Sequence, residues 1–147
     1  MKQFLTILSC VLLFSSATLA QTPTNAWTPL LTQDGRYFDK FIETLGGHGM
    51  GGMKIFQTQN LWDATMSWSV ASYLKQHPKT KIMHIVGRFH TDEQLGTFAK
   101  FKKFAPKASA INVSSFSAQD FNNPNWEQYK HLGDYIIITD PSVKRSY

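Results

Sequence analysis

The amino-acid sequence predicts an α/β fold of three layers, in which helices flank a short and mostly parallel sheet. Three short apolar runs predict strands, at residues 81–86, 109–113 and 135–139. Apolar residues at helical spacing occupy the segments between them. Strands that alternate with helices favour parallel pairing through right-handed crossovers. Three strands are few for such a sheet, because both of its faces need cover.

The first predicted helix runs from Gly35 to Leu45. Its apolar residues recur at helical spacing, and Gly46 with Gly47 follows as a stop signal. The segment from Gly46 to Met53 has five glycines in eight residues. That much backbone freedom predicts a loop.

A long and mostly buried helix is predicted from Phe56 to Gln76, where no glycine or proline interrupts the chain. The apolar run Lys81–Val86 ends at Gly87 and predicts a buried strand. Thr91 and Gln94 have the spacing of a capping box, which predicts a helix from there to Pro106.

The last predicted elements are a strand over 109–113, a helix over 124–132 and a strand over 135–139. Gly133 separates the helix from the final strand, and Asp140 with Pro141 ends that strand. The chain therefore alternates between strands and helices over its second half.

Residues 1–20 have the pattern of a cleavable secretory signal. Lys2 precedes an apolar run over 4–14 that is too short to span a bilayer comfortably, and Ala20 offers a small residue before a cut ahead of Gln21. A polar segment over 21–34 and one domain over 35–147 follow. We therefore predict export from the cytoplasm.

The only cysteine, Cys10, lies inside this signal, so the exported chain would contain no thiol ligand. Residues Ile7 to Cys10 also resemble a lipoprotein cleavage site, but cleavage there would leave too short a signal segment before the cut. The formal net charge of +5 includes a lysine cluster in and after the helix before Pro106. We interpret this cluster as a solvated helix face, and no arginine-rich stripe indicates nucleic acid.

The turn after the first predicted strand is the first candidate site. Ligands of open parallel sheets bind beyond the carboxyl ends of the strands, where Arg88 and His90 lie. An imidazole there could bind a metal, and a guanidinium could bind an acidic group. The alternative is that both are ordinary loop residues.

The long helix is the second candidate. Gln59 and Asp63 are four residues apart and share a face, with Met66 close to the same line and Trp62 beside them. A buried carboxylate there needs a partner. The alternative is a structural Asp63 that binds a loop backbone.

The glycine-rich loop is the third candidate, because His48, Met50 and Met53 offer an imidazole and thioethers, ligand types that suit haem iron or copper. The alternative is a mobile linker. We expect His84 to be a packed core residue. The remaining histidines, His77 and His131, are expected to be solvated or to cap helix ends.

Together these motifs resemble the ChaN-like family of haem-binding, iron-regulated proteins within the Tiki superfamily. The resemblance is carried by the order of four motifs and covers roughly Tyr37 to Pro141: His-Gly-Met-Gly-Gly-Met at 48–53, Gln-x-x-Trp-Asp-x-x-Met at 59–66, Gly-Arg-Phe-His at 87–90 and Leu-Gly-Thr at 95–97. It corresponds only to the later half of the family's usual domain, without the Gly-Glu-x-His-Asp motif. We interpret the chain as a fragment, an internally deleted relative, or a signal joined to a late half.

The resemblance implies a periplasmic or outer-membrane-associated haem binder in haem or iron uptake, with the outer-membrane uptake machinery as a partner. Haem would lie in an apolar cleft of Trp62, Met66 and Phe89. His90 or His48 would serve as the metal ligand, and Arg88 or a lysine would pair with a propionate. The expected cofactor-binding set comprises His90, Arg88, His48, Met50, Trp62, Asp63, Met66 and Gln59. Tyr37 and Tyr73 stay open as iron ligands.

Two alternatives remain at this stage. The wider superfamily includes metal-dependent hydrolases, for which His90, Asp63 and His48 would form half of a site. A shortened chain could also bind nothing, or could complete its sheet by forming a homodimer, because exposed strand edges favour pairing.

Overall fold

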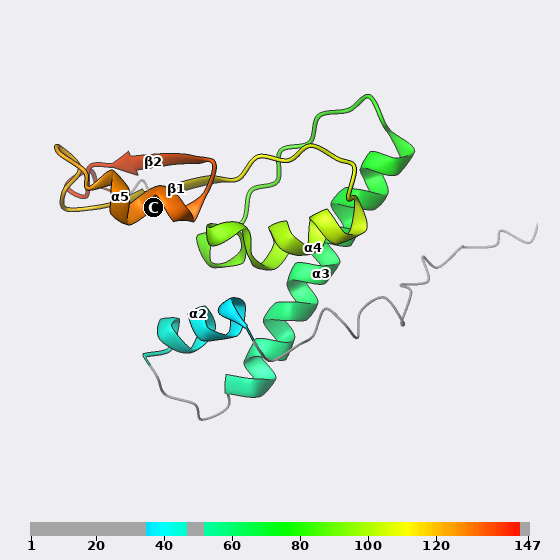
Figure 1. Ribbon diagram of the computed structural model, residues 1–147, viewed down its shortest axis with the longest axis horizontal. Helices are drawn as coiled ribbons and strands as arrows, with labels where there is room; N and C mark the ends of the chain where they lie inside the picture. Colours follow the sequence, from blue (N-terminus) through cyan, green and yellow to red (C-terminus); the bar gives the residue numbers. More distant parts are fainter. Residues whose placement is uncertain (1–34, 47–51, 145–147) are drawn as a thin grey trace, which may run out of the picture.

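The computed structural model describes residues 35–46 and 52–144. Helices dominate this described part of the chain, and a two-stranded parallel sheet lies at one end of it (Figure 1). The predicted α/β class and the parallel pairing are confirmed. The predicted signal, the segment 21–34 and two of the candidate ligands, His48 and Met50, lie outside the described residues.

Two helices open the described chain. Helix α2 spans Arg36–Thr44, close to its predicted bounds, and Gly46 follows with a φ of 66°. Helix α3 spans Gly52–Gln76. It begins four residues before the predicted start at Phe56, so the end of the predicted glycine-rich loop is helical instead.

The segment after α3 differs from the prediction. Residues 81–87 form no strand, and residues 81–85 are all exposed. An apolar run becomes a strand only when it has a neighbouring strand to pair with, and the described part of the chain pairs only β1 with β2. The predicted core position of His84 is likewise wrong, because its side chain is exposed.

Two 3₁₀ turns follow, η2 over Arg88–His90 and η3 over Asp92–Gln94, before helix α4 over Gly96–Phe104. The predicted capping box is wrong: Thr91 makes no side-chain cap hydrogen bond. Glu93 and Gln94 both adopt positive φ values, 66° and 56°, which delay the helix until Gly96.

The sheet pairs β1, over Val113–Ser117, with β2, over Tyr135–Thr139. Strand β2 lies where the sequence predicts it, whereas β1 begins at the last residue of the predicted strand 109–113. Helix α5, over Trp126–Tyr129, and the 3₁₀ turn η4, over Lys130–Leu132, connect the strands.

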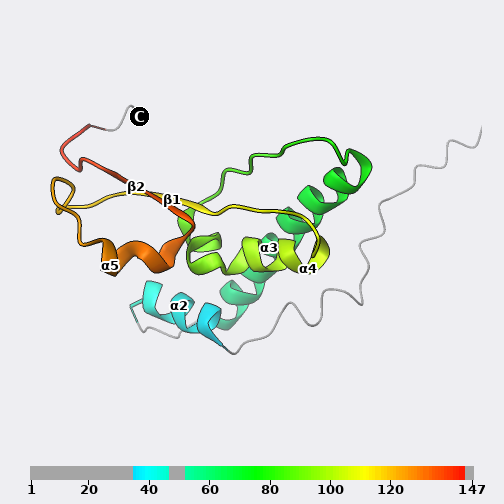
Figure 2. The same ribbon diagram turned by 45° about the horizontal axis from the view of Figure 1, so that its top comes forward.

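One face of the sheet is covered. Phe116 of β1 packs edge-on against Tyr129 of α5, with ring centroids 5.1 Å apart, so α5 lies over this face (Figure 2). The opposite face exposes Val113, Tyr135 and Ile137, which are 50%, 62% and 49% exposed. Within the described residues, the sheet therefore has an apolar face without cover.

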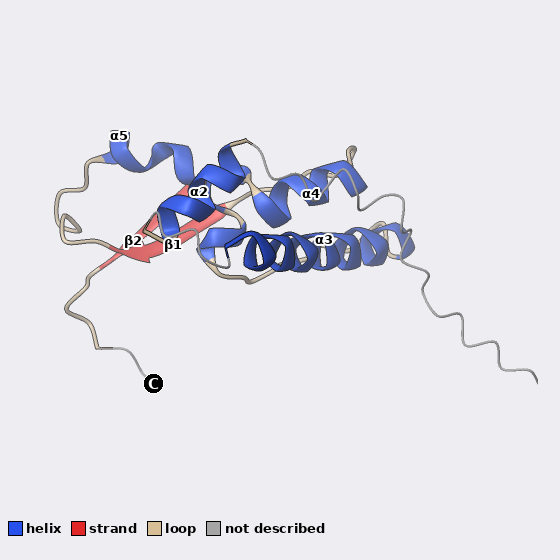
Figure 3. Ribbon diagram, turned by 90° about the horizontal axis from the view of Figure 1, so that it is seen from below, coloured by secondary structure: helices blue, strands red, loops and turns tan. Residues whose placement is uncertain are grey.

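Helices α3 and α4 pack side by side and form the better-buried half of the molecule (Figure 3). Its buried apolar side chains include Phe56 and Ala64 of α3 and Phe41 of α2. In the described ranges, no helix is both long and apolar enough to cross a membrane.

Candidate functional site

Helix α3 presents Trp62 and Asp63 in different directions. Neighbouring residues of an α-helix point about 100° apart, and here Trp62 is 54% exposed while Asp63 is fully buried. Met66, one turn further on, is half-buried and lies beside Trp62. One turn of α3 thus supplies apolar side chains to an outer cleft and a carboxylate to the interior.

The buried carboxylate of Asp63 accepts hydrogen bonds from three elements of the chain. Its Oδ2 atom lies 2.5 Å from the Tyr37 hydroxyl of α2. Its Oδ1 atom lies 2.6 Å from the Thr97 hydroxyl of α4 and 2.7 Å from Nδ1 of His90. Three donors offset the cost of burying this charge.

The Tyr37 hydroxyl stays protonated in this setting. Burial raises the pKa of Tyr37 far above its ordinary value, and the neighbouring Asp63 charge and their hydrogen bond raise it further. A protonated phenol can donate to the carboxylate but offers no anionic oxygen. The Tyr37 hydroxyl proton is therefore donated to Asp63 in this structure.

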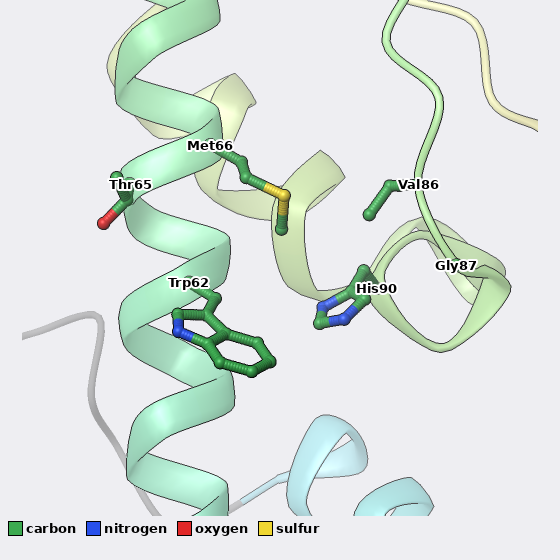
Figure 4. Close-up of a pocket in the computed structure, with 6 residues that line it drawn as sticks. All are labelled: Trp62, Thr65, Met66, Val86, Gly87 and His90. Carbon is green, nitrogen blue, oxygen red and sulfur yellow. The ribbon is translucent and has the colours of Figure 1, made fainter.

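His90 lies at the end of η2 and joins this interior to the surface. Its Nδ1 atom faces Asp63, and the other side of its ring lines an open cleft of about 320 Å³ (Figure 4). The cleft is mostly apolar and is lined by Trp62, Thr65, Met66, Val86, Gly87 and His90. In Figure 4 the His90 ring faces the Trp62 indole across the cleft, beside the Met66 thioether.

Side chains of helix α2 bind both 3₁₀ turns of this region, η2, which carries His90, and η3, which follows it. Lys40 donates hydrogen bonds to the backbone oxygens of Phe89 and Asp92, at 3.2 and 2.9 Å. Arg36 binds both carboxylate oxygens of Glu93, at 2.7 and 2.9 Å. The position of His90 thus depends on a helix 50 residues earlier in the sequence.

Close packing of α4 also fixes this region. Gly96 has a φ of 49°, and a Cβ atom placed on it would lie 2.5 Å from the backbone oxygen of His90 and 3.0 Å from the Tyr37 ring. The Ser67 hydroxyl of α3 lies 2.7 Å from the Thr97 carbonyl oxygen. Only glycine allows this approach of α4 to His90.

Lys100 corrects the interpretation of the lysine cluster as a solvated helix face. Its side chain is buried, its Nζ atom donates to Asn60 Oδ1 at 2.7 Å, and it lies 5.2 Å from the centre of the Tyr37 ring. Burial lowers the pKa of Lys100 to about 8, partly offset by the charge of Asp63. Lys102 binds the Ala108 carbonyl at 2.6 Å.

The structure brings together only part of the predicted binding set. Trp62, Met66 and His90 line one cleft, and Asp63 lies directly behind His90. Arg88 points elsewhere, pairing with Asp92 at 2.7 Å and stacking over Phe116.

Three further expectations for the cleft have different outcomes. Phe89 is not part of its lining, because its ring packs against Tyr37 and Phe41 of α2. Gln59 also lies away from it, and its buried Oε1 atom has no hydrogen-bond partner among the described atoms. The predicted ligands His48 and Met50 lie outside the described residues.

From the sequence, Tyr37 is only a candidate iron ligand, and Thr97 has no predicted role of its own. Both are isolated hydroxyl residues, 26 residues before and 34 after Asp63. The one local signal was Gly96 next to Thr97, a glycine at the start of a helix where close approach is needed. Their convergence on one carboxylate is a tertiary feature.

Two further features of the described residues bear on the site, their metal-binding side chains and a second groove. Across residues 35–46 and 52–144, no group of three or more His, Cys, Asp or Glu side chains could hold a metal ion. A second groove of about 740 Å³, between the end of α3 and the end of α4, contains no predicted site residue. The described site is thus one histidine, one carboxylate behind it and an apolar cleft.

Over the described residues, fold and site together define a small α/β protein with a cleft that His90 lines and the buried carboxylate of Asp63 backs. A family model described as haem-binding uptake, Tiki superfamily, ChaN matches residues 14–101. The chain therefore belongs to this family, as its motifs predicted. No curated protein and no solved structure matches it.

Proposed function

We propose that this protein binds haem in the cleft between α3 and η2, with Nε2 of His90 as an iron ligand. The observation that carries the proposal is the His90 ring, which contacts Asp63 through Nδ1 and lines an apolar cleft on its other side. Histidine is a common protein ligand of haem iron. Trp62 and Met66 provide the aromatic and thioether surface that a porphyrin face would contact.

The donor set favours haem over a bare catalytic metal. A porphyrin supplies four nitrogen ligands of its own, so one or two protein ligands suffice. A catalytic zinc ion normally needs three protein ligands, and the described residues offer no such group. For the hydrolase alternative, the structure brings together His90 and Asp63, and the third candidate ligand, His48, lies outside the described residues.

We also propose that the protein acts outside the cytoplasm, in haem or iron uptake. The support is the secretory pattern over residues 1–20 and the uptake function in the family's description. Contact with outer-membrane uptake machinery and the formation of a homodimer remain predictions. The exposed face of β1 and β2 is where we would place a homodimer contact.

A haemin titration tests the proposed site. Protein beginning at Gln21 is titrated with haemin while the Soret band is followed. We expect a shifted band that saturates in the wild type. His90→Ala should weaken binding at least tenfold, and His84→Ala, which replaces an exposed histidine on the segment before η2, should leave it unchanged. A spectrum that stays that of free haemin, or equal binding by the wild type and His90→Ala, would contradict the proposal.

A rescue experiment separates ligation from folding. His90→Gly removes the imidazole, and free imidazole added to this variant should restore the wild-type Soret position if Nε2 is the ligand. Far-ultraviolet circular dichroism checks that the variant is folded. Failure of imidazole to change the spectrum of a folded, haemin-bound His90→Gly protein would assign the iron to another residue.

A further inference from the structure

A buried hydrogen-bond network lies behind His90, and the burial of a carboxylate at its centre needs a physical reason. Asp63 is fully buried, yet it accepts from Tyr37, Thr97 and His90 at 2.5 to 2.7 Å. Burying a carboxylate is costly, and helix packing alone could be achieved with an apolar residue at this position. The direction of these hydrogen bonds indicates how the Asp63 charge acts on His90.

The network determines which nitrogen of His90 carries the proton. The Tyr37 and Thr97 hydroxyls both donate to the carboxylate of Asp63, which in its ionised form can only accept hydrogen bonds. Nδ1 of His90 lies 2.7 Å from Oδ1 of Asp63, so it too must donate. A neutral imidazole with its proton on Nδ1 has its lone pair on Nε2.

We propose that Asp63 is a positioning residue that fixes His90 as the Nδ1–H tautomer and makes Nε2 a stronger electron donor. The part of the inference that concerns iron rests on the proposed function. The part that concerns the tautomer of His90 is independent of it. Carboxylates that accept from the second nitrogen of a ligating histidine fix its ring and raise its basicity. Tyr37 and Thr97 then limit how much of the Asp63 charge acts on His90, because they share the same two oxygens.

This sharing gives substitutions opposite effects. Asp63→Asn removes the charge, so Nε2 should become a weaker donor. Thr97→Val removes a competing donor from the oxygen that His90 also uses, so more of the charge acts on His90 and Nε2 should become a stronger donor. If the network served only to pack α3 against α4, both substitutions would lower stability and neither would shift the donor strength in a defined direction.

The tautomer is measured in the protein without haemin. Long-range ¹⁵N–¹H spectra of histidine-labelled protein, at mildly alkaline pH, distinguish Nδ1–H from Nε2–H. We expect Nδ1–H for His90 in the wild type and a mixture or Nε2–H in Asp63→Asn. The matched control is Asp92→Asn, which removes another buried carboxylate that pairs with Arg88 and not with His90. A wild-type Nε2–H tautomer, or an unchanged tautomer in Asp63→Asn, would overturn the proposal.

The donor strength is measured with haemin bound. A stronger Nε2 donor stabilises the ferric state, so the reduction potential should rise in Asp63→Asn and fall in Thr97→Val. Shifts in the same direction for both variants would overturn the proposed sharing of charge. If haemin does not bind while the apo-protein shows the expected tautomer, the proposed function fails and the role of Asp63 in fixing the tautomer stands.

Discussion

The helical half and the strand half of the molecule satisfy their side chains in different ways. Around α3 and α4 several polar side chains are buried and hydrogen-bonded, among them Asp63, Asn60 and Lys100. At the sheet, one whole face of β1 and β2 exposes apolar side chains such as Tyr135 and Ile137. The helical half therefore has a fixed internal arrangement, whereas the strand half presents a surface suited to cover by another structure.

The largest effect should come from Gly96 in the helical half. Gly96→Ala places a methyl group 2.5 Å from the His90 carbonyl oxygen at a positive φ, and we expect a loss of about 3 kcal/mol in the free energy of unfolding. Gly46→Ala is the matched control, since Gly46 also has a positive φ but nothing within 4 Å. It should cost about 1 kcal/mol. Urea denaturation measures both, and equal losses would contradict the close packing of α4.

An intermediate effect should appear as a pH dependence of stability. The pKa of Lys100 is lowered from 10.5 to about 8 by burial, so between these values the unfolded chain binds more protons than the folded one. Stability should therefore rise with pH, by about 1–2 kcal/mol from pH 8 to pH 10. Above that, the raised pKa of Tyr37 opposes the gain, because only the unfolded tyrosine ionises.

Thermal denaturation across this pH window checks the expectation. Lys100→Met should flatten the rise, while Lys40, whose pKa is also lowered by burial, keeps its contribution in both proteins. A slope that is the same in Lys100→Met and the wild type would show that Lys100 is solvated.

The smallest effect on stability should come from the strand half. Ile137→Thr on the exposed face of β2 keeps a β-branched side chain and removes apolar surface that is already half in water. We expect a change below about 0.5 kcal/mol in the free energy of unfolding. Self-association in sedimentation experiments should decrease if this face is a contact between copies. A loss of several kcal/mol would instead show that the face is buried in the free protein.

The same contrast explains what the sequence could predict. Helices α2 and α3 are predictable because apolar residues recur at helical spacing in the first, which Gly46 follows as a stop signal, and because no glycine or proline interrupts the second after Phe56. Strand β2 was predicted with correct bounds because Tyr-Ile-Ile-Ile-Thr is rich in β-branched residues. Strand β1 was placed too early, since its serine-rich sequence has no apolar pattern and is a strand through its pairing with β2.

The site was less predictable, for a physical reason. Trp62, Asp63, Met66 and His90 stand in local motifs, and the structure brings them to one place. Tyr37 and Lys100 stand in none, and their roles arise from contacts across at least 26 residues. Arg88 is predicted as a ligand residue from its charge and its place after the first predicted strand, whereas in the structure it pairs with Asp92, four residues later.

The exposure of Trp62 has a practical consequence. This indole is about half in water and lies across the cleft from His90, so a ligand that enters the cleft must displace solvent from it. Its fluorescence should change in colour and intensity as the cleft fills, and Trp62→Phe would identify the contribution of this indole to the signal. The protein thus contains its own optical reporter of occupancy.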